Sequence, residues 1–107
     1  MKEKLMNLFE TSESAQIFVE DCKKSFFNNI RSLKEEIAKC EKMVERLQTD
    51  ITNITRELPE TREDLKEINL ALIENKKAMI DALNLAILHY SVELKFVQAN
   101  LDMLNTL

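Results

Sequence analysis

A single proline, Pro59, near the middle of a 107-residue chain that contains no glycine, is the feature that most limits the possible folds. Inside a helix this residue would lose a backbone hydrogen bond and clash with the preceding turn, at a cost of about 3 kcal/mol. In the first turn of a new helix it costs almost nothing. The sequence therefore predicts two helical arms, 12–57 and 62–106, joined by a turn over residues 56–61 and preceded by a short helical lead over residues 2–10.

The composition predicts an all-α fold and a single domain covering residues 1–107. Charged residues make up 32% of the chain, tryptophan is absent, and 45% of the residues are hydrophobic. Long helices and coiled coils have this composition. The net charge is −4, and acidic and basic residues are mixed along the chain. Because nucleic-acid binding requires clustered Lys and Arg, we expect no nucleic-acid partner.

The first arm carries a heptad pattern of apolar residues from Ile30 onward. Nine consecutive seam positions are apolar, and charged residues occupy the other faces. Such a pattern is typical of a coiled-coil seam. The predicted seam of this arm consists of Ile30, Leu33, Ile37, Cys40, Val44, Leu47, Ile51, Ile54 and Leu58.

The second arm is apolar on two faces, and a helix of this kind needs neighbours on both sides. At its start, Thr61 and Asp64 resemble a capping box. One stripe continues the predicted seam through Ile73, Ile80, Leu83, Ile87, Tyr90, Leu94, Val97, Leu101 and Leu104. The other stripe has no evident cover within the chain and is the predicted partner interface; it consists of Leu85, Leu88, Val92, Phe96, Ala99 and Met103.

Two arrangements of the arms fit these patterns. The first is an antiparallel coiled-coil hairpin, broken at Pro59, that assembles further into a helical bundle. The second is an extended parallel coiled coil with a kink at Pro59, and it is supported by a seven-residue spacing that passes through the proline: Leu58, Leu65, Leu72 and Met79. The aromatic residues favour the hairpin, because folding about Pro59 would bring residues 18–27 opposite residues 90–99 and gather the rings in one cluster.

The sequence offers little to support catalysis. His89, the single histidine, has Glu93 one turn away, which gives two potential ligands where a zinc site needs three or four. Without glycine there is no phosphate-binding loop. Cys22 and Cys40 are expected to be buried thiols on an apolar stripe. We therefore expect no enzymatic activity, no cofactor, no metal and no small-molecule substrate.

The expected function is that of a structural scaffold. We expect a coiled-coil module that associates with itself or with another coiled-coil subunit, as in cytoskeletal, cell-division or trafficking assemblies. No signal-peptide core or membrane span is visible, so we expect an intracellular protein, cytoplasmic or nuclear. The alternative is a protein that lies on a membrane surface through its apolar C-terminal helix; it ranks second because residues 80–107 contain one cation, Lys95.

Overall fold

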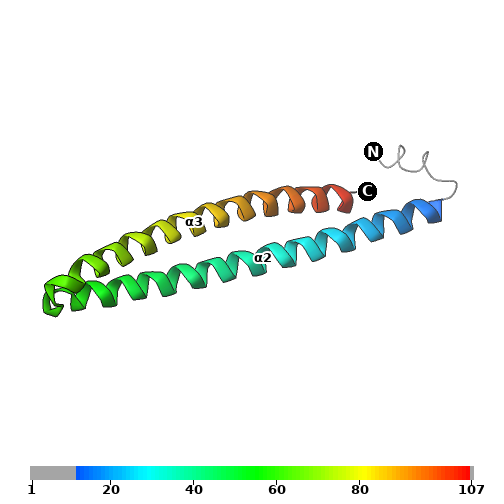
Figure 1. Cartoon of the computed structure of the whole chain (residues 1–107). Coiled ribbons are helices and arrows are strands. Elements are labelled where there is room, and N and C mark those ends of the chain that lie inside the picture. The colour runs from blue at the N-terminus through cyan, green and yellow to red at the C-terminus, as the bar shows by residue number, and fades with distance from the viewer. Residues whose placement is uncertain (1–11, 107) are drawn as a thin grey trace. The chain divides into compact units, whose positions relative to one another are not determined.

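The described part of the chain is almost entirely helical in the computed structural model, which describes residues 12–106 (Figure 1). Helix α2 spans Ser12–Glu57, a short 3-10 helix η1 spans Leu58–Glu60, and helix α3 spans Glu63–Asn105. No strand is present within residues 12–106. The predicted all-α fold is therefore confirmed. The predicted lead over residues 2–10 lies outside the described residues.

Local interactions support both long helices. Neither contains glycine or proline. Ion pairs between residues three positions apart join Glu20 to Lys23 at 3.7 Å and Glu63 to Lys66 at 3.0 Å. Each exposed pair of this kind contributes a few tenths of a kcal/mol, roughly 0.2 to 0.5 kcal/mol. Since such small terms do not stabilise an isolated helix, the apolar faces must supply most of the stability.

The connection between α2 and α3 is short and needs no left-handed residue. Pro59 lies within η1, and the backbone N–H of Thr61 donates to the carbonyl of Leu58 at 3.1 Å. The Thr61 hydroxyl donates to the carbonyl of Glu57 at 2.8 Å. No residue from 12 to 106 has a positive φ, so the absence of glycine does not prevent the turn.

The Thr61 hydroxyl has a different role from the one that the sequence suggests. In a capping box it would accept a hydrogen bond from the start of the following helix. In the structure it closes the end of α2 by donating to Glu57, while the Asp64 carboxylate accepts from Arg62 at 2.8 Å. The first backbone bonds of the next helix go to the carbonyl of Arg62, from Leu65 and Lys66.

The chain divides into two compact units, one of which is the turn unit, Glu36–Tyr90. It contains the end of α2, the turn and the start of α3, which together form a helical hairpin (cyan-green through yellow to orange in Figure 1). Cys40, Leu47 and Ile73 are buried between the two helices. Lys76 on α3 also forms an ion pair with Asp50 on α2 at 3.3 Å. In this unit the chain forms a hairpin, and the alternative of a rod continuing through Pro59 is not observed.

The second unit, the terminal unit, combines the beginning of α2 up to Glu35 with the end of α3 from Ser91. Among its described residues, Ala15 and Ile30 on α2 and Leu101 on α3 are buried. The predicted gathering of all aromatic rings is wrong, because Phe27 is 59% exposed and Phe96 is 68% exposed. Both rings lie on faces of their helices that are turned away from the buried residues, so they cannot contribute to the core.

Candidate interaction surface

The nine seam residues predicted on the first arm are all buried or half-buried; Leu58 lies in η1 and the other eight lie on α2. Ile30, Cys40 and Leu47 are buried. The remaining six are half-buried: Leu33, Ile37, Val44, Ile51, Ile54 and Leu58. Both cysteines are free thiols on this helix; Cys40 is buried as predicted, whereas Cys22 is half-buried.

The inner stripe of α3 behaves in the same way. Ile73 is buried in the turn unit, and Leu101, the least exposed residue among the buried core residues at 3%, is buried in the terminal unit. The others are half-buried: Ile80, Leu83, Ile87 and Tyr90 in the turn unit, and Leu94, Val97 and Leu104 in the terminal unit. The ring of Tyr90 lies 5.9 Å from the ring of His89, measured between centroids.

All residues of the predicted partner interface on α3 are exposed. In the turn unit these are Leu85 and Leu88. In the terminal unit they are Val92, Phe96, Ala99 and Met103, which we call the outer face of the terminal unit. The large side chains of both groups are between 45% and 68% exposed. No element of the chain covers them within the described residues.

Other exposed apolar residues were not singled out by the sequence pattern. They are Ile17, Phe18, Phe27 and Met43 on α2, and Ile68 and Leu70 on α3. Leu65, Leu72 and Met79, which would form the seam of a rod, are also more than two-fifths exposed. Leu65, Leu72 and Met79 keep the seven-residue spacing that supports the rod, and Ile68, three residues after Leu65, lies on the same side of α3.

Polar residues border the outer face of the terminal unit on both sides. Lys95 and Asp102 lie seven residues apart and therefore on one flank of α3, because seven residues make two helical turns. Glu93 and Asn100 have the same spacing on the other flank. The Asp102 carboxylate also accepts a hydrogen bond from the side chain of Gln98 at 3.0 Å. The face is therefore an apolar strip with Lys95 and Asp102 along one edge and Glu93 and Asn100 along the other.

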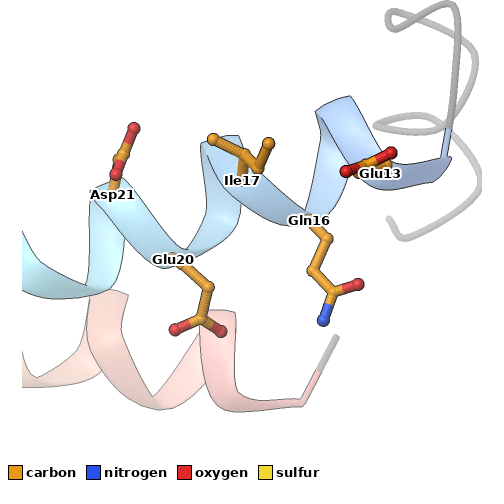
Figure 2. A pocket seen from close by; sticks show the side chains of 5 residues that line it. All are labelled: Glu13, Gln16, Ile17, Glu20 and Asp21. Atoms are coloured by element: carbon orange, nitrogen blue, oxygen red, sulfur yellow. The ribbon is translucent and has the colours of Figure 1, made fainter.

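A hollow at the start of α2 is a weaker candidate (Figure 2). It is lined by five exposed residues of one helix: Glu13, Gln16, Ile17, Glu20 and Asp21. Figure 2 shows that Ile17 and Asp21 point to one side of α2 while Gln16 and Glu20 point to the other. Because the polar groups diverge, they do not form a site that holds a ligand.

Two further properties describe the residues from 12 to 106. No helix among them is sufficiently long and apolar to cross a membrane. No group of three or more His, Cys, Asp or Glu side chains in this part of the chain is placed to hold a metal ion.

No protein-family model, curated protein or solved structure matches the chain at a significant level.

Proposed function

We propose that the chain is a non-enzymatic scaffold module that binds a helix of another subunit, or of a second copy, through the outer side of α3. In this proposal α2 and α3 pair as an antiparallel coiled coil, and Pro59 ends the first helix of the hairpin. The apolar heptads on α2 and the inner stripe on α3 support the pairing. The cost of placing a proline inside a helix supports its role at the break.

The observation that carries the proposal is the contrast between two sides of α3 in the terminal unit. Leu101 is 3% exposed, whereas Phe96, little more than one turn away along the same helix, is 68% exposed. Exposed apolar side chains that follow one another along a face mark interaction sites more often than isolated ones do. Covering Val92, Phe96 and Met103 would therefore stabilise an assembly by removing apolar area from water.

The small number of buried residues also supports association with a further helix. Among residues 12–106 no side chain is completely buried, and each of the two units has three buried apolar residues in this part of the chain. Small helical domains with few buried residues are commonly stabilised by oligomerisation. A helix laid on the outer side of α3 would provide a second layer of packing, as in a helical bundle.

The test compares one substitution on each side of α3 in the terminal unit. Phe96→Asp is expected to leave the helical circular dichroism intact and to lower the mass measured by light scattering. Leu94→Asp is expected to unfold the chain, because Leu94 lies on the half-buried stripe. Phe27→Asp is the matched control, since Phe27 is an exposed phenylalanine of the same unit on α2. Equal masses for the wild type, Phe96→Asp and Phe27→Asp would count against self-association.

A hetero-partner and a membrane surface are separated by two further measurements. If the chain is monomeric, Phe96→Asp should abolish capture of a helical partner that the wild type and Phe27→Asp both retain. The exposed apolar residues would also favour a bilayer surface, but surface-binding helices usually carry several cations on their polar face. Sedimentation of the wild type with anionic phosphatidylserine vesicles would support binding to a membrane surface and contradict the proposed scaffold function.

A further inference from the structure

We propose that the partner of the terminal unit is a second copy of this chain, with the two outer faces of α3 packed antiparallel about a two-fold axis. This inference rests on the proposed function, and it adds the identity of the partner, the direction of the pairing and its register. It is carried by the size and charge pattern of six exposed residues of α3: Val92, Lys95, Phe96, Ala99, Asp102 and Met103.

The apolar residues of the outer face have coiled-coil spacing. Val92 and Ala99 are seven residues apart, as are Phe96 and Met103, and the two series alternate by four and three residues. These are the d and a positions of a heptad. When two helices pair antiparallel about a two-fold axis, each a residue lies opposite a d residue of the other copy. Placing Phe96 opposite Ala99 of the second copy also places Val92 opposite Met103.

This register matches side chains by size. Phe96 is the largest side chain of the face and lies opposite Ala99, the smallest. The two-fold axis produces this pair twice. Alternation of large and small residues across facing positions lets two surfaces interdigitate without voids. In a parallel in-register pair, by contrast, Phe96 would meet Phe96 and Ala99 would meet Ala99, which leaves one layer crowded and the next underfilled.

The charged flank selects the same register. With Phe96 opposite Ala99, Lys95 of each copy lies beside Asp102 of the other, and the symmetry gives two such ion pairs. Helical side chains lean toward the N-terminus of their own helix, so in antiparallel helices these two side chains lean toward each other. Moving one helix by a heptad sets Lys95 against Lys95 in one direction and Asp102 against Asp102 in the other. Like charges at these flanking positions disfavour both alternatives.

The opposite flank is compatible with this register. Glu93 lies beside Asn100 of the second copy, whose amide group can donate a hydrogen bond to a carboxylate. The hydrogen bond from Gln98 engages one oxygen of the Asp102 carboxylate. The second oxygen can accept from Lys95 of the other copy, since a carboxylate has several acceptor positions. The charge pattern is thus satisfied on both edges of the pair.

A charge-swap experiment tests the register. Dissociation constants are measured by sedimentation velocity on the full chain, with circular dichroism as a check on folding. Lys95→Glu and Asp102→Lys should each weaken self-association by about tenfold, because each single change turns two attractions into two repulsions. The double variant Lys95→Glu/Asp102→Lys restores opposite charges across the antiparallel pair and should return the dissociation constant to near the wild-type value.

Three results would overturn the inference: single variants that bind like the wild type, a double variant as weak as the single ones, or a wild-type chain that is monomeric at all concentrations. Phe96→Asp separates this failure from a failure of the proposed function. If Phe96→Asp weakens association or partner capture while the charge variants do not, the outer face binds a helix but not in this register. If Phe96→Asp is also without effect, the proposed function fails as well.

Discussion

The side-chain ammonium of Lys76 on α3 lies 3.3 Å from a carboxylate oxygen of Asp50 on α2, and this ion pair connects the two helices of the turn unit. The two residues are 26 positions apart in the sequence, so the contact depends on the hairpin. The Lys76 side chain is 25% exposed, whereas the Asp50 side chain is 52% exposed. The pair therefore fixes how the helices are aligned more than it stabilises them.

Asp50→Asn is expected to lower the free energy of unfolding by about 0.5 kcal/mol, since an exposed ion pair contributes little in water. Urea denaturation of the wild type, Asp50→Asn, Lys76→Met and the double variant gives the coupling between the two residues. The coupling should decrease in high salt, because added ions screen exposed charges. A coupling energy of zero at low salt would show that the two side chains do not interact in solution.

Leu101→Ala should be among the most destabilising single truncations in the terminal unit. Leu101 is 3% exposed, and removing a buried leucine side chain costs about 2 to 5 kcal/mol through lost burial and the cavity that remains. Leu70→Ala is the control, because Leu70 lies on the same helix and is exposed. Its expected cost is below about 0.5 kcal/mol. Thermal denaturation of both variants should place the midpoint of Leu101→Ala well below that of Leu70→Ala.

The sequence predicted the helical nature of the fold because apolar residues recur with helical spacing in a chain without internal glycine. It predicted the Ile73 register for the hairpin but left the Leu72 register open for the alternative rod. Leu72 continues the seven-residue spacing from Leu58, yet the structure exposes Leu72 and buries its neighbour Ile73. The reason is physical: the turn over residues 58–62 resets the rotation of the second helix, and only packing against α2 determines which face is then covered.

The candidate interaction surface could be identified from the sequence for a related reason. Apolar residues on a second face of one helix have no role within a two-helix structure, so their spacing indicates a further neighbour. The aromatic residues were less informative, because Phe27 and Phe96 have helical positions that point away from the buried seam. Side-chain type alone does not show which residues meet, whereas the position on the helix does.

Thr61→Val is expected to destabilise the turn by about 1 kcal/mol. The Thr61 hydroxyl donates to the carbonyl of Glu57, one of the last carbonyls of α2, and valine preserves the shape of the side chain but not the donor. Thr49→Val is a matched control, since the Thr49 hydroxyl donates to the carbonyl of Glu45 at 3.0 Å in the middle of α2. That carbonyl already has a helical partner, so its extra bond adds little. Urea midpoints that fall equally in both variants would contradict a capping role for Thr61.

The two free thiols should react at different rates with a thiol reagent such as dithionitrobenzoate. Cys22 is half-buried, whereas Cys40 is buried against the seam of the turn unit. Because the reagent must reach the sulfur, Cys22 should react without unfolding, and Cys40 should react only as the turn unit opens.

Single variants Cys22→Ser and Cys40→Ala assign the fast and slow phases of the thiol reaction. Cys40→Ala should leave the fast phase unchanged, and Cys22→Ser should remove it. Denaturant at concentrations that open the turn unit should accelerate the slow phase alone. If Cys40 reacts as fast as Cys22 in the folded chain, then the seam residues around it do not exclude solvent, and the hairpin packing of the turn unit is looser than the structure requires.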